Sequence, residues 1–191
     1  MSKKKKIKYI ILLFFLSVYF AIYYNQYDKA VKPDIRYFDK GTVIENFGMS
    51  YDVSGKIYSK DELIKEYGIA EYMFGESSNE YEKKYIIVTE IIKKYSDEII
   101  DEPNDIRNMT IYSKFWQVGY EMDLTEELHR SAEKSTYELK AGESIVEYRV
   151  FSIASCNLSE KLWENVEKTT VWYEFTDTET CPYVRRIRII N

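Results

Sequence analysis

Residues 83–96, KKYIIVTEIIKKYS, carry the strongest strand signal in the chain. The stretch is rich in β-branched and aromatic residues, and these side chains favour a pleated, half-buried backbone. Because successive side chains on a strand project to opposite faces, apolar residues fall on both sides of it. We therefore predict a strand here that helps to organise a sheet. One face carries Ile87, Thr89 and Ile91, and the other carries Ile86, Val88 and Glu90.

Several other segments alternate apolar and polar residues, which is typical of strands. They span 36–53, 54–59, 110–122, 145–153, 169–177 and 183–190. Gly41, Gly48 and Gly55 interrupt the first two segments, and we expect a turn or a bulge at each glycine. Residues 140–143 are expected to form the turn of a hairpin that leads into the strand 145–153.

Short helices are expected between these strands. Ser59 and Glu62 have the spacing of a capping box, so a helix should begin there and end at Gly68. The other helical segments are 123–133, with Asp123 or Thr125 as its N-cap, and 159–168. Strand segments follow one another without regular alternation with helices, which favours an antiparallel sandwich over a parallel sheet. We predict a mainly β fold, an antiparallel β-sandwich of about seven or eight strands with short helical excursions.

The charge and composition of the chain exclude some classes of binding partner. Five of the 27 basic residues are lysines in the first eight positions, so 22 remain against 32 acidic residues, a net charge of −10. An acidic body repels nucleic-acid phosphates, and we expect no nucleic-acid partner. A single histidine and two cysteines without a CxxC spacing argue against structural zinc, and no cofactor is expected.

The N-terminus has the pattern of a targeting segment, in which a lysine-rich tip precedes an apolar stretch at residues 7–24. The stretch is short for a span, which takes roughly 20 apolar residues, but Lys8 can reach back to the interface. No A-x-A-like cleavage pattern and no lipidation cysteine follow it. We expect an uncleaved transmembrane signal anchor, with a cleaved signal peptide and a buried structural segment as the alternatives.

This anchor divides the chain into three predicted parts. Residues 1–27 are the cytoplasmic basic tip and the transmembrane helix, residues 28–37 are a juxtamembrane connector, and residues 38–191 are an extracellular β-sandwich domain. Basic residues flanking a span stay in the cytoplasm, so the N-terminus is expected inside the cell and the C-terminal domain outside.

Four stretches together resemble a known family. They are GTVIENFGMSYDVSGKIYSKDELIKEYG (41–68), EKKYIIVTEIIKKYS (82–96), YELKAGESIVEYRVFSI (137–153) and VRRIRI (184–189). With the lysine-tipped anchor, they resemble the membrane-anchored telokin-like, immunoglobulin-fold surface proteins of low-GC Gram-positive bacteria. The resemblance implies an immunoglobulin-like sandwich over roughly residues 38–190. No activity is established for that family, so the resemblance implies no substrate.

The last two strand segments carry the candidate interaction residues. Tyr173 and Phe175 should face the core, and Trp172 should project from the opposite side, where an exposed aromatic suits a protein contact. In the final strand, Arg186 and Arg188 share one face. They would either protect an edge strand with charge or form a small site for an anion.

Two further candidates are chemically defined. Cys156 and Cys181 are a candidate disulfide, because an extracytoplasmic location permits oxidation; two free thiols are the alternative. Asp101, Glu102 and Asp105 are a weak candidate for Ca²⁺ binding, although their spacing matches no EF-hand and a solvated acidic turn is favoured.

These residues favour a binding module over an enzyme, because no catalytic constellation stands out among them. We expect an extracytoplasmic module that binds a protein or a cell-envelope component. The alternative is a small-ligand or Ca²⁺-binding sensor on the cell surface that uses the acidic loop at 101–105.

Overall fold

The computed structural model describes residues 13–24, 33–46, 48–74, 81–96, 107–129, 138–176 and 183–191, with the backbone alone at 107–109. The chain divides into two compact units, Met1–Asp34 and Ile35–Asn191. In the first unit, residues 13–24 form a helix whose side chains are exposed and mostly apolar. Within the described part of the chain, no helix is both long enough and apolar enough to cross a membrane.

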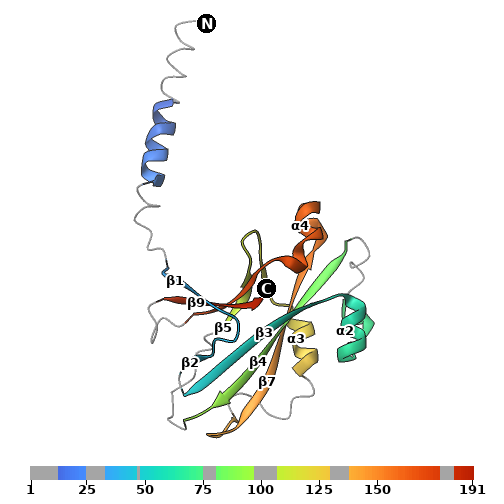
Figure 1. The fold of residues 1–191 in the computed structure, drawn as a ribbon. Coiled ribbons are helices and arrows are strands. Elements are labelled where there is room, and N and C mark those ends of the chain that lie inside the picture. The colour runs from blue at the N-terminus through green and yellow to red at the C-terminus, as the bar shows by residue number, and fades with distance from the viewer. Residues whose placement is uncertain are drawn as a thin grey trace, which may run out of the picture. The chain divides into compact units, whose positions relative to one another are not determined.

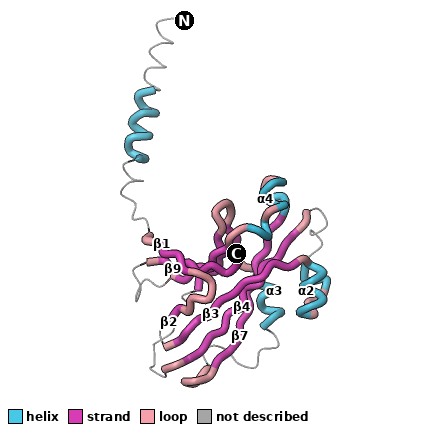
Figure 2. Tube along the Cα trace, viewed as in Figure 1, coloured by secondary structure: helices cyan, strands magenta, loops and turns pink. Residues whose placement is uncertain are grey.

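The second unit is built mainly from strands, which form two sheets (Figures 1 and 2). The mainly β prediction is therefore confirmed. In the first sheet all neighbouring strands are antiparallel. Its strands, in spatial order, are β2 (Ile44–Asn46), β3 (Met49–Tyr58), β4 (Lys83–Lys94) and β7 (Ser144–Ala154).

The second sheet contains five strands, of which one pair is parallel. In spatial order they are β1 (Ile35–Phe38), β9 (Val184–Ile190), β8 (Val171–Phe175), β5 (Arg107–Tyr112) and β6 (Gln117–Gly119). β1 pairs with β9 in parallel, and the other neighbours are antiparallel. The single strand expected at 110–122 is instead the two strands β5 and β6.

The final strand β9 lies inside this sheet, so the prediction of an edge strand was wrong. Its additional neighbour is β1, which begins within the stretch 28–37 that the sequence assigned to a polar connector. The strand segment predicted at 36–53 overlaps β1, but its parallel pairing with a strand at the far end of the chain has no local signal in the sequence.

A hydrophobic core joins the two sheets. Val53 and Ile86 contribute from the four-stranded sheet, and Tyr173, Phe175 and Ile187 contribute from the five-stranded sheet. Each of these side chains is at most 1% exposed. The predicted core positions of Tyr173 and Phe175 are therefore confirmed, and the two sheets have the face-to-face packing of a β-sandwich.

Gly55 lies inside β3 and not at the turn that the sequence suggested. A Cβ atom at this position would lie 2.9 Å from Cδ1 of Ile189 on β9. The glycine therefore allows the two sheets to approach closely at this point. Gly41 and Gly48 do have positive φ angles, which agrees with their predicted turns.

A second core covers the opposite face of the four-stranded sheet. There α2 (Lys60–Tyr67), α3 (Met122–His129) and the 3₁₀ helix η1 (Glu71–Phe74) pack against β4 and β7. Figure 1 shows α2 and α3 beside that sheet. Because both faces of β4 meet a core, Ile86 and Ile87 are both buried, whereas Ile91 beyond the helices is 47% exposed.

The start of α2 matches its prediction. Ser59 and Glu62 form the complete capping box, and Gly68 ends the helix in the left-handed conformation. The N-cap predicted for α3 was wrong, because Asp123 and Thr125 both lie inside that helix.

Thr125 instead covers the outer edge of β7. Its Oγ1 accepts a hydrogen bond from the backbone N–H of Val150 at 3.0 Å, and Nε2 of His129 accepts from the N–H of Tyr148 at 3.0 Å. Backbone donors at an edge strand otherwise remain available for pairing with another chain.

The remaining short helices are η4 (Ser155–Asn157), α4 (Glu160–Glu164) and η5 (Val166–Lys168), and the last two confirm the helical turn expected at 159–168. The predicted hairpin around 140–143 is only partly correct. Gly142 forms a turn with a φ of 90°, but residues 138–140 form no strand. β7 pairs with β4 instead.

Candidate functional site

The candidate site lies on the outer face of the five-stranded sheet, where β1, β9 and β8 are neighbours. Alternation along β9 buries Arg185 and Ile187 and turns Arg186 outward, on the face that the sequence predicted. The strand register places Arg186 beside Tyr37 of β1 and Glu174 of β8. Residues from both ends of the domain therefore meet on one surface.

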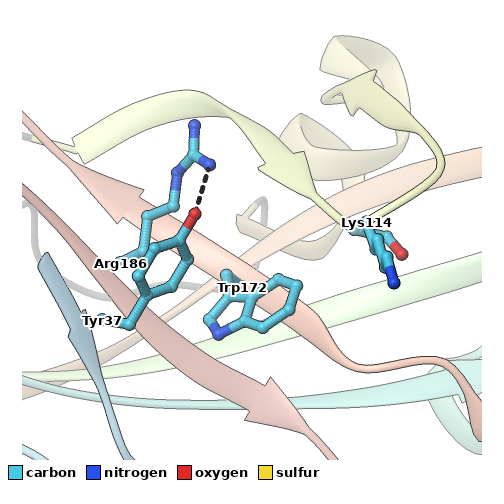
Figure 3. Close-up of a pocket in the computed structure, with 5 residues that line it drawn as sticks. Tyr37, Lys114, Trp172 and Arg186 are labelled. Atoms are coloured by element: carbon cyan, nitrogen blue, oxygen red, sulfur yellow. Dashed lines mark hydrogen bonds between the residues drawn. The ribbon is translucent and has the colours of Figure 1, made fainter. Parts of the chain in front are cut away.

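Arg186 is fixed by charge and by aromatic contacts. Its Nε donates a hydrogen bond to Oε2 of Glu174 at 2.8 Å. Its Nη1 donates to the hydroxyl oxygen of Tyr37 at 3.4 Å, the bond drawn in Figure 3. Its Cζ lies 3.9 Å from the ring centroid of Tyr112, within cation–π range. Burial alone would lower the pKa of Arg186, but the hydrogen bond and charge of Glu174 outweigh burial and raise it. The guanidinium is thus a permanently charged, well-oriented group.

Tyr37 and Trp172 form a corner of two aromatic rings. Their centroids are 5.4 Å apart and their planes are inclined by 70°. Tyr37 is 58% exposed and Trp172 is partly buried, as the sequence predicted for the tryptophan. A partly exposed indole beside an exposed phenol offers apolar surface to a ligand.

These residues line a pocket with a volume of about 490 Å³, formed by Tyr37, Ser113, Lys114, Trp172 and Arg186. Ser113 and Lys114 lie in the connection between β5 and β6. Figure 3 shows Lys114 across Trp172 from Tyr37 and Arg186. The volume falls in the range of roughly 300–1,000 Å³ that is usual for small-ligand pockets.

Two groups at the Lys114 end have unused hydrogen-bonding capacity. The Lys114 ammonium lies 5.5 Å from the ring centroid of Phe115 and is paired with no carboxylate among the described residues. The hydroxyl of Ser113 is buried and has no hydrogen-bond partner in the same part of the chain. A buried hydroxyl without a partner carries a free-energy cost, which a ligand relieves if the side chain turns toward the pocket.

Arg188 shares the outer face but does not line the pocket. Its Nη2 lies 3.0 Å from Oδ1 of Asp39, and the side chains of this pair are 39% and 88% exposed. Ion pairs with this exposure contribute little to stability. Of the three predicted interaction residues, the structure brings Trp172 and Arg186 together in the pocket and leaves Arg188 beside it.

Four residues of this site were missed by sequence reasoning, namely Tyr37, Ser113, Lys114 and Glu174. Tyr37 was placed where the predicted connector 28–37 overlaps the strand segment 36–53, and nothing local marks its pairing with β9. The polar pair at positions 113 and 114 did carry a signal, because it interrupts the apolar alternation of 110–122 and so indicates a turn.

The other predicted residues lie elsewhere. Cys156 is exposed in η4, with its Sγ 3.6 Å from Oδ1 of Asn157, and Cys181 lies outside the described residues. The disulfide therefore stays a prediction. The acidic residues Asp101, Glu102 and Asp105 also lie outside them. Where the structure does describe the chain, no three His, Cys, Asp or Glu side chains are grouped to hold a metal ion.

Comparison of the chain with protein-family models, curated proteins and solved structures gave no match. The resemblance to telokin-like surface proteins consequently stays a prediction. Fold and site together define a class of molecule, a two-sheet β domain that carries an aromatic and cationic pocket on the outside of one sheet.

Proposed function

We propose that this protein is a membrane-anchored binding module, displayed outside the cell, that recognises a protein or a cell-envelope component through the pocket on its five-stranded sheet. One observation carries the proposal. Pairing of β9 with β1 on one side and β8 on the other brings exposed Tyr37, partly exposed Trp172 and oriented Arg186 together around one pocket. Tyrosine, tryptophan and arginine are the residues that dominate the energetics of binding surfaces.

Binding is favoured over catalysis by the chemistry of the pocket. Ser113 is a hydroxyl that could act as a nucleophile only if a neighbouring base accepted its proton. Its Oγ has no hydrogen-bond partner among the described residues, and no carboxylate or imidazole lines the pocket beside it. Such a hydroxyl is suited to orienting a ligand and not to attacking one.

The anchor is supported by the N-terminal unit. Its described helix, residues 13–24, exposes large apolar side chains, among them Phe14 at 64% and Phe20 at 52%. Exposed apolar groups of this kind are stabilised by transfer to an apolar environment. The lysines that precede them would keep the N-terminus in the cytoplasm and the domain outside. An immunoglobulin-like identity of the sandwich belongs to the same proposal.

Site-specific photo-crosslinking in intact cells tests the proposal. A photoreactive phenylalanine analogue replaces Tyr37 in the pocket of the full chain, and in a matched variant it replaces Ile91, which is 47% exposed on the four-stranded sheet. We expect a discrete crosslinked product from position 37. The substitution Trp172→Ala should diminish it, and so should an excess of unlabelled protein added outside the cells. Equal products from the two positions, or none from position 37, would remove the pocket as the binding surface.

A further inference from the structure

The ligand of the pocket can be specified by chemical class, an inference that rests on the proposed binding function. We infer that the pocket binds a single carboxylate attached to a flat apolar group. The carboxylate lies at the Lys114 and Ser113 end, the apolar group covers the indole of Trp172, and a neutral acceptor reaches Arg186. Hydrogen-bonding capacity, charge and layout each support this assignment.

Donors dominate the hydrogen-bonding capacity of the pocket, because its two charged groups, Lys114 and Arg186, have no acceptor. Lys114 carries only donors, and the Ser113 hydroxyl, which has no hydrogen-bond partner among the described residues, can donate. The Arg186 guanidinium uses Nε and Nη1 in its contacts and has further N–H groups. The nearby carboxylate, Glu174, does not line the pocket and already accepts from Arg186 and Tyr112. A ligand that supplies acceptors therefore matches both cations of the pocket.

The charge of the site matches one negative charge. Glu174 neutralises Arg186 and Asp39 pairs with Arg188, whereas Lys114 has no carboxylate partner within the part of the chain that the structure describes. A site with one excess positive charge favours a monoanion over a phosphate, which carries more charge at neutral pH. The remainder of the protein after the lysine tip has a net charge of −10 and repels extended polyanions.

The pocket has two ends. Lys114 marks the end with a net positive charge, and Arg186, neutralised by Glu174, marks the other. In Figure 3, Lys114 lies on one side of Trp172, and Arg186 with Tyr37 lies on the other. A flat group over the indole can therefore place a carboxylate at the first side and a carbonyl oxygen at the second. A free aromatic acid with an acyl group and the C-terminal residue of a peptide share this pattern of carbonyl, apolar body and carboxylate.

Fluorine NMR of the full chain in detergent micelles measures the inferred binding. The three tryptophans are labelled with 5-fluorotryptophan, and single replacements by phenylalanine assign their signals. The probes are N-acetyl-phenylalanine, its carboxamide, inorganic phosphate and a five-residue peptide ending in a free phenylalanine carboxylate. We expect the acid to shift the Trp172 signal, while the signal of Trp163, which lies on α4 away from the pocket, stays unchanged.

Matched lysine variants test whether Lys114 recognises the negative charge of the carboxylate. Lys114→Gln should weaken binding of the acid about tenfold, because a charge-assisted contact is lost. Lys93→Gln removes the same charge from the four-stranded sheet and should leave binding unchanged. Tighter binding of the peptide than of N-acetyl-phenylalanine would identify the C-terminus of a protein or peptide as the source of the carboxylate. Equal binding would identify a free acid.

The inference fails on three results. Equal binding of the acid and its carboxamide would show that the pocket recognises only an apolar group. Tighter binding of phosphate would exclude the monoanion, and absence of any shift with the acid would exclude the carboxylate. If crosslinking from position 37 persists in that last case, the carboxylate inference alone is wrong. If crosslinking is absent as well, the proposed function is wrong with it.

Discussion

Replacing Arg186 by methionine should destabilise the folded domain markedly. Arg186 and Glu174 form a 2.8 Å ion pair in which the two side chains are 16% and 7% exposed. Removing one partner of a buried pair leaves an uncompensated charge, which costs about 3–5 kcal/mol. Because part of the arginine still reaches solvent, the lower end applies, about 3 kcal/mol. For a chain of this length that corresponds to a fall in melting temperature of about 6–12 °C.

Thermal melts of the full chain in detergent, followed by near-ultraviolet circular dichroism, measure this change. Lys56→Met serves as the control, since Lys56 and Glu66 form an ion pair at 3.4 Å with side chains that are 63% and 48% exposed. That variant should lose less than about 1 kcal/mol. Replacing Glu174 by methionine together with Arg186 removes both charges and should recover most of the loss. A cost for Arg186→Met no larger than the control, or a double variant as unstable as the sum of the single ones, would refute the reasoning.

Three further predictions concern the core at Gly55, the buried Tyr85 and the edge of β7 that Thr125 covers. Gly55→Ala should cost about 1–3 kcal/mol in chemical denaturation, and Ile189→Val, which removes the nearest atom, should reduce that cost; additive effects would argue against the contact. Burial, with a smaller contribution from Glu121, raises the pKa of Tyr85 to about 12 from its usual value near 10. The proton is held more tightly in the folded state, so this stability is fully present below about pH 10 and is lost as the pH rises through about 12. Tyr85→Phe should make the melting temperature less sensitive to pH in that range, and an unchanged profile would remove Tyr85 as the cause. Thr125→Val should leave the N–H of Val150 without its acceptor, cost about 1–3 kcal/mol and speed hydrogen exchange at that amide, whereas Thr125→Ser should not; equal exchange in both variants would contradict the edge contact.

Features that depend on a few neighbouring residues could be predicted from the sequence. The capping box at Ser59 and Glu62 is one, because every atom it needs lies within four positions. The outward face of Trp172 and Arg186 is another, since alternation along a strand is a property of the backbone itself. Both predictions were correct because neither feature depends on contacts with a distant segment of the chain.

Features that depend on distant segments could not be predicted. Gly55 looks like a turn residue, and only the approach of Ile189 explains why a strand continues through it. Thr125 has the chemistry of an N-cap, but its hydroxyl is used by β7, which follows in the sequence. In both cases the local sequence is compatible with the predicted conformation and with the observed one, and a tertiary contact selects the observed one.

The pocket depends on the same kind of long-range contact, and this dependence identifies the segment that controls it. Tyr37 lies on β1, directly after the N-terminal unit, and it contacts both Arg186 and Trp172. A fragment beginning at residue 38, the boundary that the sequence suggested, would lack Tyr37 and most of β1. β9 would then become an edge strand, Arg186 would lose a hydrogen-bond partner, and Trp172 would lose the ring that forms its corner. A change that displaces β1 should therefore alter the pocket directly, because Tyr37 is one of the residues that line it.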